Sequence, residues 1–319
     1  MAWKEFSQGK MKKDDVLEFK FKLEDNLFQL HRELFTKTYR HSHYTAFNIQ
    51  DPKLRRIHKA CVKDRVLHHA VFRILYPIFD KSFIFDSYSC RKEKGTHRAV
   101  NRLEVFARKL SKNNTKNIFA LKCDIKKFFD SIDQEILLNL IKRKIKDENT
   151  IWLIEIILKS FPSKGLPLGN VTSQLFANIY LNELDQFVKH ELKAKYYLRY
   201  CDDFIILGES EKELAKLIPQ IGNFLNQKLK LKLHPNKVII RKHGQGIDFL
   251  GYVALPYHRV LRTKTKRRMI RKVKQKHKEM KAGNVSKEHF QASSQSYLGV
   301  LGHCKGRRVR RRVEGVLKC

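Results

Sequence analysis

Two adjacent acids, Asp202 and Asp203, stand between two stretches of sequence that are typical of strands. The segment YYLRY (196–200) precedes them and FIIL (204–207) follows, so aromatic and branched residues flank a predicted tight turn. Two ionised carboxylates in such a place repel each other and resist removal from water. Asp is also a common turn residue, because its side chain bonds to nearby backbone groups, so an ordinary surface hairpin is the simpler alternative.

A third acid favours a chemical explanation. Asp124 lies near the end of the segment IFALKCDI (118–125), whose alternation predicts another strand. If this strand pairs with the hairpin of acids, three carboxylates meet at one end of a sheet, and cations are needed among them. Such oxygen ligands suit two Mg²⁺ ions, with Mn²⁺ as a substitute. Two ions ~3.5–4 Å apart activate a 3′-hydroxyl and stabilise leaving pyrophosphate, which is polymerase chemistry.

The charge of the chain predicts the partner that this chemistry requires. The 319 residues include 67 Lys and Arg against 32 Asp and Glu, for a net charge of +35. An excess of this size favours polyanionic partners. The basic residues are densest in 262–281 and 305–312, and apolar residues among them predict an ordered basic helical region. Nucleic acid is therefore the first expected partner, and an anionic membrane surface is the second.

Other features of the sequence narrow the class and the compartment. The longest apolar run, 151–161, contains Glu155 and Lys159 and is too short to span a bilayer, and residues 1–15 lack the apolar segment of a signal peptide. We therefore expect no membrane association. His68 and His69 have no third metal ligand nearby, so we expect them to be structural. The chain has six cysteines without metal-ligand or redox spacing, which predicts free thiols in a reducing cytoplasm: Cys61, Cys90, Cys123, Cys201, Cys304 and Cys319.

The remaining patterns predict an α+β fold. Expected strands lie near 118–125, 196–207, 238–241 and 247–254, and expected helices cover 14–75, 98–111, 134–146, 149–160, 175–192 and 211–230. Hairpin-paired strands among long helices are typical of this class. The length indicates about two domains or one large composite domain.

Seven ordered blocks over roughly residues 60–260 resemble the reverse transcriptase family. The blocks are DRVLHHAVFRILYPIFD, SYSCRKEKGTHRAV, LKCDIKKFFDSID, GLPLGNVTSQLFANIYL, YCDD, KLKLHPNKVII and IDFLGYV. A lone tyrosine-any-Asp-Asp motif recurs by chance, whereas seven blocks in order are specific. The resemblance implies a right-hand polymerase: an N-terminal helical region and fingers (1–120), a palm (121–260) with a fingers-associated helical insertion at about 135–165, and a short basic helical thumb (261–319).

The resemblance also implies roles for residues near the three acids. Asp124 and Asp202 would bind both metal ions, with Asp203 assisting and the backbone carbonyl of Ile125 as a further ligand. Lys237 matches the lysine proposed to protonate the leaving pyrophosphate. Phe249, Leu250 and Gly251 match the turn that, in the family, grips the primer end.

Further positions match residues that hold the nucleotide. Arg91 and Lys94 correspond to basic fingers positions that bind the triphosphate, a task for which the guanidinium fork is suited. Ordinary surface charge is the alternative for both. Phe129 lies five positions after Asp124, where the family has an aromatic residue that excludes a ribose 2′-hydroxyl. The alternative is that Phe128 and Phe129 are both core residues.

The middle block departs from the usual family pattern. Most reverse transcriptases read Gln-Gly there and then Ser-Pro, whereas this chain has Leu168-Gly169 and Ser173-Gln174. The departure resembles the reverse transcriptases of diversity-generating retroelements, which copy a template RNA with errors at adenines and install the cDNA in a target gene. Leu168 offers no hydrogen bond, so a misaligned nucleotide forfeits less, and a loss of ~1.4 kcal/mol is tenfold in error rate. The alternative is that Leu168 only packs the loop.

The resemblance implies partners and leaves alternatives. The implied partners are template RNA, the RNA/DNA duplex, dNTPs and a basic oligomeric accessory protein, in a bacterial, archaeal or phage-encoded system. About 60 residues follow the last block, enough for a thumb but short of the regions that group II intron proteins usually add. A compact reverse transcriptase of retron, intron or defence type is one alternative. A non-polymerising RNA-binding protein is another, and the three intact acids argue against it.

Overall fold

The computed structural model describes residues 1–50, 53–162 and 164–318, and it confirms the α+β class. Cys319 lies outside the described residues. The N-terminal half contains α1 (Ala2–Ser7), α2 (Asp14–Phe21), α3 (Leu23–Phe35), β1 (Thr45–Gln50), β2 (Leu54–Lys59), α4 (Val62–Asp80), α5 (Thr96–Leu110), β3 (Phe119–Asp124), α6 (Phe128–Ser131), α7 (Gln134–Lys142) and α8 (Glu148–Lys159).

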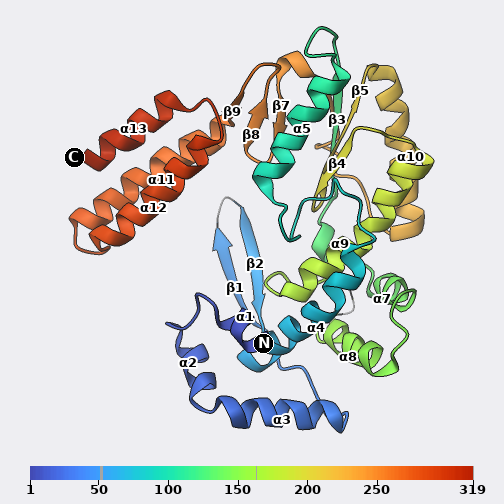
Figure 1. The fold of residues 1–319 in the computed structure, drawn as a ribbon, viewed down its shortest axis with the longest axis vertical. Coiled ribbons are helices and arrows are strands. Elements are labelled where there is room, and N and C mark those ends of the chain that lie inside the picture. The colour runs from blue at the N-terminus through green and yellow to red at the C-terminus, as the bar shows by residue number, and fades with distance from the viewer. Residues whose placement is uncertain (51–52, 163, 319) are drawn as a thin grey trace.

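The C-terminal half alternates helices with short strands (Figure 1). Its elements are α9 (Val171–Gln186), a π-helix (Phe187–Glu191), β4 (Tyr197–Tyr200), β5 (Asp203–Gly208), α10 (Glu211–Leu229), β6 (Ile239–Lys242), a 3₁₀ turn (His243–Gln245), β7 (Ile247–Phe249), β8 (Tyr252–Ala254), β9 (Arg259–Leu261), α11 (Thr263–Lys281), α12 (Lys287–Gly302) and α13 (Arg307–Lys318).

The central antiparallel sheet has the strand order β4-β5-β3-β6 and is covered on both faces. On one face, Leu121 and Cys123 of β3 join a core that includes α9 and α10. On the other face, Ala120 and Ile205 join a core with α5 and the sheet β7-β8-β9. Because side chains alternate along a strand, Asp124 shares the face of Ala120. The sheet therefore presents Asp124 toward the β7-β8-β9 side.

A buried ion pair fastens this sheet to the helix and loop beside it. Arg199 of β4 donates from Nε to Asp185 Oδ1 at 2.7 Å and from Nη2 to Asp185 Oδ2 at 2.6 Å. Both side chains are fully buried. Tyr197 donates to the same carboxylate at 2.6 Å, and Arg199 also donates to Ser87 Oγ at 3.1 Å. The pair thus joins β4, α9 and the segment before α5.

The N-terminal region differs from the prediction of a largely helical segment over 14–75. Strands β1 and β2 form an antiparallel hairpin there, with Thr45 opposite Lys59 and Gln50 opposite Leu54. The Asp-Pro pair in NIQDPKLRRIHK is a turn signal between two extended runs, and it could have predicted the hairpin. The backbone of the hairpin is tied to the loop before α9, because His58 N donates to Leu168 O at 2.8 Å.

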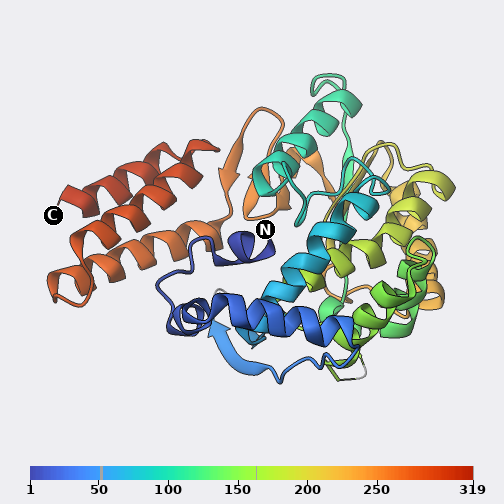
Figure 2. The same ribbon diagram turned by 60° about the horizontal axis from the view of Figure 1, so that its bottom comes forward.

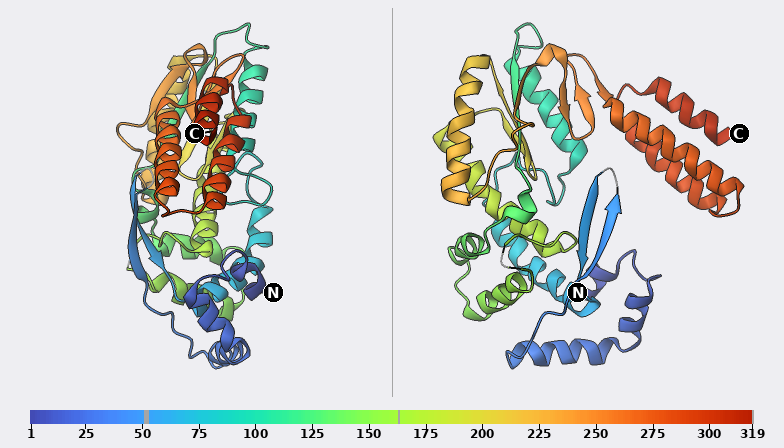
Figure 3. Two further views of the ribbon diagram at one scale, coloured as in Figure 1. Left: turned by 90° about the vertical axis from the view of Figure 1, so that its left-hand side faces the viewer. Right: turned by 180° about the vertical axis from the view of Figure 1, so that it is seen from behind.

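Three basic helices complete the chain. The small sheet β7-β8-β9 leads into α11, α12 and α13, which pack side by side and extend away from the central sheet (Figures 1 and 3). Met269 and Val273 of α11, Phe290 of α12 and Val313 of α13 are buried in their shared core. Exposed basic residues recur along α11 at helical spacing: Arg267, Arg271, Lys274 and Lys278.

Three further predictions can be compared with the fold. In the described chain, no helix combines the length and the apolar character needed to cross a membrane. The five described cysteines are free thiols. His68 is buried and lies 2.7 Å from Thr172 Oγ1 and 3.1 Å from His41 Nε2, which confirms the structural role expected for it.

We predict that Arg199→Met destabilises the chain by about 3–5 kcal/mol, because it leaves the Asp185 carboxylate buried without its counter-charge. The free energy of unfolding in urea measures the change. Arg143→Met is the matched control, since its pair with Glu183 lies at the surface with the Arg143 side chain 65% exposed, and it should cost at most about 1 kcal/mol. Equal losses in the two variants would contradict the proposed importance of the buried pair.

Candidate active site

The strand register brings the three predicted acids to one end of the central sheet. Asp124, the last residue of β3, pairs with Asp203, the first residue of β5. Asp202 lies in the turn between β4 and β5, and its carbonyl accepts a hydrogen bond from Ile125 N at 3.2 Å. The pairing expected from the sequence is therefore confirmed.

The turn that carries Asp202 is strained, and a hydrogen bond from Arg199 stabilises it. Cys201 has a φ of +56°, in the left-handed region that costs an L-residue about 1–2 kcal/mol. Tyr200 pairs with Asp203 across this two-residue turn, a geometry that usually selects glycine. Arg199 Nη1 donates to Cys201 O at 3.1 Å. The buried Arg199–Asp185 pair therefore also supports the turn that presents the acids.

Two lysines neutralise the acids in this structure. Lys237 Nζ donates to Asp124 Oδ1 at 2.7 Å. Lys122 Nζ lies 3.2 Å from Asp203 Oδ2 and also donates to the carbonyl of Asp248 at 2.9 Å. Lys122 precedes Asp124 by two residues, so both side chains lie on the same face of β3. These contacts provide cations among carboxylates that would otherwise repel each other.

The environment raises the pKa of two of the acids. Burial raises the pKa of Asp202, and the nearby charge of Asp124 adds to this effect. Burial also raises the pKa of Asp203 to about 6, with Lys122 acting in the opposite direction and Asp124 and Asp202 reinforcing the rise. The ionised acids are thus less stable here than in water, which is the condition that a bound cation relieves.

The donors present fit a divalent metal ion, although they do not form a ready-made ligand cluster. Among the described residues, no three His, Cys, Asp or Glu side chains converge as a metal site. However, Asp203 Oδ1 is buried without a hydrogen-bond partner. Carboxylate and carbonyl oxygens are the ligands that Mg²⁺ and Mn²⁺ prefer. Displacing Lys122 and Lys237 would free the oxygens that they now engage.

A cavity of about 500 Å³ opens beside these acids. Its charged lining residues are Lys53, Lys122, Asp124, Asp203, Lys237, Arg241, Asp248, Arg262 and Lys264. They come from β3, β5, β6 and the loop before it, β7, the start of α11 and the residue just before β2. Cations outnumber carboxylates in this lining, so the cavity suits an anionic ligand bound next to the acids.

The two basic residues predicted to hold the triphosphate do not line this cavity. The Arg91 side chain is only 7% exposed, and it donates to Asp80 Oδ1 and to the carbonyl of Ile84, each at 2.7 Å. Lys94 Nζ donates to the carbonyl of Phe85 at 2.9 Å and lies 3.4 Å from the centre of its ring. Both side chains are thus engaged by the end of α4 or by the loop between α4 and α5.

The predicted nucleotide-binding loop is fixed by backbone contacts on two sides. Gly169 has a φ of +128°, and a Cβ there would meet the carbonyl oxygen of His58 at 3.0 Å. Leu166 N donates to the carbonyl of Phe129 at 2.8 Å. The loop thus lies between the β1–β2 hairpin and the segment after Asp124. Leu168 is half-buried in this loop.

The other predicted nucleotide and primer residues fall into two groups. Phe128 is buried and Phe129 is half-buried, with ring centres 5.4 Å apart, so at least Phe128 is a core residue. Gln174 is exposed in the first turn of α9. The predicted primer turn connects β7 and β8 through Leu250 (φ +49°) and Gly251 (φ +88°), as a two-residue hairpin requires, while Phe249 is buried.

The sequence analysis missed charged residues that lie next to the acids. Lys122 and Asp248 both line the cavity, and Arg262 forms an ion pair with Asp248. The alternation of LKCD places Lys122 on the face of Asp124, so the spacing alone could have identified it. Lys53 could have been found only by recognising the β1–β2 hairpin.

Comparison with known proteins identifies the family. The family described as reverse transcriptase (RNA-dependent DNA polymerase) matches residues 49–254, which is more than half of the chain. The chain belongs to the reverse transcriptase family. The match begins within β1 and ends with β8, so it includes β2, the three acids and the turn at Leu250.

Relatives with curated descriptions agree with this family. Protein YkfC of Escherichia coli (strain K12) is 25% identical over 255 residues, covering 67% of this chain and 65% of YkfC. The group II intron-encoded protein LtrA of Lactococcus lactis subsp. cremoris is 29% identical over 271 residues, covering 63% of this chain and 44% of LtrA. The chain therefore spans less than two thirds of the length of either relative.

Similar solved structures establish the fold. Apo telomerase from Candida tropicalis aligns with a TM-score of 0.54 at 14% identity, covering 74% of this chain and 52% of that one. Telomerase from the same organism, in complex with a fragment of telomeric RNA, aligns over 92% of this chain and 56% of that one, with a TM-score of 0.53 and 14% identity. This reverse transcriptase therefore has the right-hand polymerase fold that the sequence predicted.

We predict that Asp203→Asn stabilises the metal-free protein by about 1 kcal/mol at pH 7, because it removes a buried charge whose ionisation is unfavourable. For a chain of this size the melting temperature should rise by about 2 °C, measured in a buffer that contains a chelator.

The pH dependence of this gain has a defined sign. The raised pKa means that the wild-type folded state takes up a proton as the pH falls through about 6, whereas the unfolded state takes it up only near the ordinary, lower pKa. Wild type therefore gains stability on acidification, and its difference from Asp203→Asn should shrink below about pH 6. Asp130→Asn, at an exposed position, is the control. If Asp203→Asn melts at a lower temperature than wild type at pH 7, the prediction is contradicted.

Proposed function

We propose that this reverse transcriptase is an RNA-directed DNA polymerase of a diversity-generating retroelement, making cDNA with errors at template adenines. The observation that carries the proposal is the combination of Leu168-Gly169, in the loop between the hairpin and the Asp124 segment, with Ser173-Gln174 in the first turn of α9. An apolar Leu168 in that loop offers no hydrogen bond with which to restrain an incoming nucleotide. The polymerase itself is supported by the three acids and the basic cavity beside them.

We propose the following roles for residues around the acids. Asp124, Asp202 and Asp203, with the carbonyl of Ile125, would hold two Mg²⁺ ions, or Mn²⁺ in their place. When bound, the ions supply activation of the primer 3′-hydroxyl and neutralisation of charge on the leaving pyrophosphate. Lys237 already lies 2.7 Å from Asp124 and would hold a proton at Nζ for the pyrophosphate.

The nucleic acid would be held by the regions around the palm. We propose fingers and an N-terminal helical region in 1–120, a palm in 121–260 with the insertion at about 135–165, and a thumb in 261–319. The exposed basic residues of α11 would contact phosphates of the RNA/DNA duplex, and Phe249, Leu250 and Gly251 would support the primer end. Phe129, Leu168, Gly169 and Gln174 would border the incoming dNTP.

The triphosphate would enter the basic cavity beside the acids. Lys53 is exposed just before β2 and lines that cavity, so it is a further candidate contact. Contact of the triphosphate with Arg91 or Lys94 remains a prediction. For Arg91 it requires exchange of the present bonds to Asp80 and the Ile84 carbonyl.

The second candidate is a compact reverse transcriptase of the group II intron type that copies its template faithfully. The 29% identity with LtrA favours it. Sequencing of cDNA made from the native template distinguishes the two candidates, because substitutions concentrated opposite adenines support the diversity-generating type. A uniform, low error frequency across the four template bases supports the intron type.

A basic accessory protein is the proposed protein partner. Two basic proteins repel each other unless RNA lies between them or their contact is largely apolar. We expect the isolated chain to copy its native template poorly and the accessory protein to increase that activity. Full template-specific activity of the isolated chain would remove the need for the partner.

We predict that Asp202→Asn reduces DNA synthesis below about one hundredth of wild type, because the loss of one anionic ligand impairs two-metal chemistry. RNA affinity should stay within about twofold, since removal of a negative charge does not weaken attraction to phosphates. Primer extension and a filter-binding assay measure the two effects. Substantial residual synthesis would show that the acids have been assigned the wrong role.

We predict that Leu168→Gln lowers misincorporation, most clearly opposite adenine, by restoring a polar group that restrains the incoming nucleotide. The change should appear in the ratio of wrong to right insertion, because discrimination is a difference between two transition-state energies. Single-nucleotide insertion opposite each template base, with each dNTP, measures it.

Leu168→Met is the matched control for this variant, because Met is similar in volume and is still apolar. It should remain error-prone. If Leu168→Gln equals wild type in every insertion ratio, Leu168 is a packing residue and the source of any infidelity lies elsewhere.

We predict that the double variant Arg267→Ala, Arg271→Ala weakens duplex binding and flattens its salt dependence. Each lost phosphate contact removes about 0.9 from the slope of log affinity against log salt, so the pair should reduce the slope by about 1.8. Titrations at several salt concentrations measure the slope. Lys159→Ala on α8, with 77% of its side chain exposed, is the control and should leave the slope unchanged.

A further inference from the structure

A buried carboxylate on α4, that of Asp64, orders the segment between α3 and β1. It is fully buried and accepts hydrogen bonds from Tyr39 OH at 2.7 Å and from Ser42 N at 2.9 Å. It also accepts one from Cys61 Sγ at 3.1 Å, and His41 Nδ1 lies 3.6 Å from it. Burial acts to raise the pKa of Asp64, but His41 and these hydrogen bonds lower it below its ordinary value. Asp64 is therefore a buried anion whose donors hold the segment against the start of α4.

Hydrogen bonds continue from His41 to the first turn of α9. His41 Nδ1 lies 2.7 Å from the carbonyl oxygen of Ser42, which can only accept, so this nitrogen carries a proton. His41 Nε2 lies 3.1 Å from His68 Nε2, and His68 Nδ1 lies 2.7 Å from Thr172 Oγ1. Burial lowers the pKa of His68 to about 3, and the nearby His41 acts in the same direction, so the ring is neutral at pH 7. A neutral ring has one donor and one acceptor, so its bond to Thr172 is tied to its bond with His41.

A second connection reaches Asn170, the N-cap residue of α9, which is 3% exposed. Asn at an N-cap usually accepts a hydrogen bond from the amides of the first turn, but its side chain forms no such bond within the described chain. Its Nδ2 donates to Tyr44 OH at 3.2 Å, and its Oδ1 is buried with no partner among the described residues. Tyr44 OH also lies 3.3 Å from His41 Nε2 and 3.0 Å from Ser160 Oγ. The start of α9 is thus tied to Tyr44 instead of being capped by its own asparagine.

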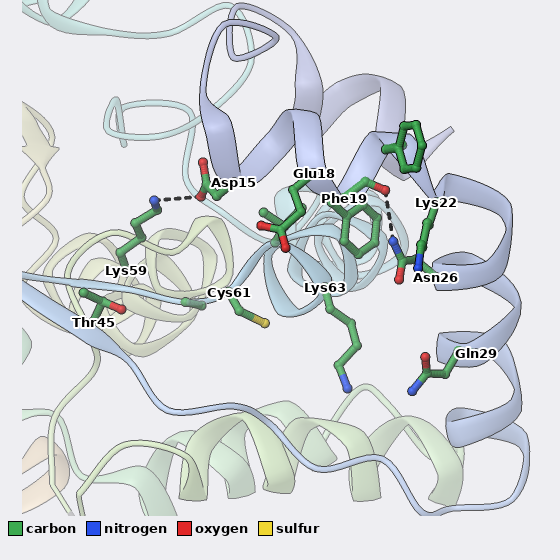
Figure 4. A pocket seen from close by; sticks show the side chains of 13 residues that line it. Asp15, Glu18, Phe19, Lys22, Asn26, Gln29, Thr45, Lys59, Cys61 and Lys63 are labelled. Carbon is green, nitrogen blue, oxygen red and sulfur yellow. Dashed lines mark hydrogen bonds and ion pairs between the residues drawn. The ribbon is translucent and has the colours of Figure 1, made fainter.

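We call the residues behind these two connections the Asp64 network: Tyr39, His41, Ser42, Tyr44, Cys61, Asp64 and His68. The network lies where apolar packing covers only one side. Helices α4 and α9 lie side by side (Figures 1 and 2), but β1 is exposed throughout and β2 is exposed or half-buried. A cavity of about 770 Å³ opens at the junction of β2 with α4, and Figure 4 shows Thr45, Lys59 and Cys61 along it. Hydrogen bonds therefore hold this region where packing does not.

The contacts of the N-terminal region converge on residues 168–172. Four of these five residues are held: Leu168 by the His58 amide, Gly169 by close approach to the His58 carbonyl, Asn170 by Tyr44 and Thr172 by His68. Two of the four contacts are made by side chains of the Asp64 network. The position of the loop that carries Leu168 therefore depends on this network as well as on the hairpin backbone.

We propose that the Asp64 network positions this loop for the incoming dNTP, with Asn170 and Thr172 as positioning residues. Both side chains are buried, so they act through Leu168 and Gly169 and do not touch the nucleotide. This inference rests on the proposed function, which assigns that loop to the dNTP. Loss of either connection lets the start of α9 shift, and a shifted loop binds the nucleotide less tightly while the three acids stay in place.

The test measures single-nucleotide insertion by the full chain on a primed RNA template with Mg²⁺, with rates divided by the concentration of active sites. Thr172→Val keeps the shape of the side chain, removes the hydroxyl and leaves His68 Nδ1 unpaired. It should raise the KM for the correct dNTP at least about threefold and change kcat less than about twofold, because it alters nucleotide binding and leaves the chemistry at the acids intact. Thr172→Ser restores the hydroxyl and should return the KM close to the wild-type value.

Tyr180→Phe is the matched control. It also removes a buried hydroxyl from α9, one that donates to the carbonyl of Leu229 at 2.7 Å, away from the loop. Its KM should equal that of wild type. A general loss of stability lowers the fraction of active protein in either variant and leaves the KM of the remaining active sites unchanged, so the KM separates positioning from a structural effect.

Tyr44→Phe tests the second connection and carries the test if Thr172→Val does not fold. It removes the acceptor of Asn170 Nδ2 and should also raise the KM for the dNTP with little change in kcat. If Thr172→Ser raises the KM as much as Thr172→Val, the hydroxyl is not the positioning group and the proposal is overturned.

The remaining outcomes distinguish this inference from the proposed function. If Thr172→Val and Tyr44→Phe keep the wild-type KM while Leu168→Gln changes the insertion ratios, the network is only structural, and the proposed function stands. If the two network variants raise the KM but cDNA from the native template lacks errors at adenines, the positioning role stands and the diversity-generating type is wrong. If none of the three variants changes insertion, the loop does not border the dNTP and the proposal is overturned.

Discussion

The buried pair of Arg199 and Asp185 is the constraint on which the geometry of the site depends. A buried guanidinium is tolerable only when its charge and its donors are satisfied. The partners of Arg199 come from α9, from the segment before α5 and from the turn after β4. Its hydrogen bond to Cys201 holds a left-handed residue beside Asp202. One side chain thus fixes the strand, the helix and the strained turn relative to one another.

A second constraint is the mutual repulsion of the three acids, and the fold manages it with lysines. Lys122 forms an ion pair with Asp203, and Lys237 forms one with Asp124. The pKa of Asp203 is raised nevertheless, because the effect of burial exceeds that of Lys122. The ionised form of Asp203 is therefore less favourable here than it would be on a solvent-exposed surface. This is the relation expected if the three acids are the proposed active centre, because strained or destabilised groups at functional sites persist only where the surrounding packing stabilises them.

The parts of the molecule that sequence could predict are those with local signals. The alternation around Asp124 and the residues flanking Asp202 predicted two strands and their pairing, which the register confirms. The β1–β2 hairpin was missed because its exposed, highly charged strands lack the apolar alternation of a half-buried sheet. The contacts of Arg91 could not be predicted, since its partner Asp80 and the Ile84 carbonyl meet it only through the path of the loop.

The link between the β1–β2 hairpin and the loop at Gly169 has a consequence for how the sequence can change. The link consists of backbone atoms, the His58 amide with the Leu168 carbonyl and the close approach of Gly169 to the His58 carbonyl. Such a joint does not depend on the identity of the hairpin side chains. Side-chain substitutions in the hairpin would therefore leave these backbone contacts in place, provided that position 169 keeps its glycine. This link therefore restricts the residue type at position 169 more strictly than it restricts the side chains of the hairpin.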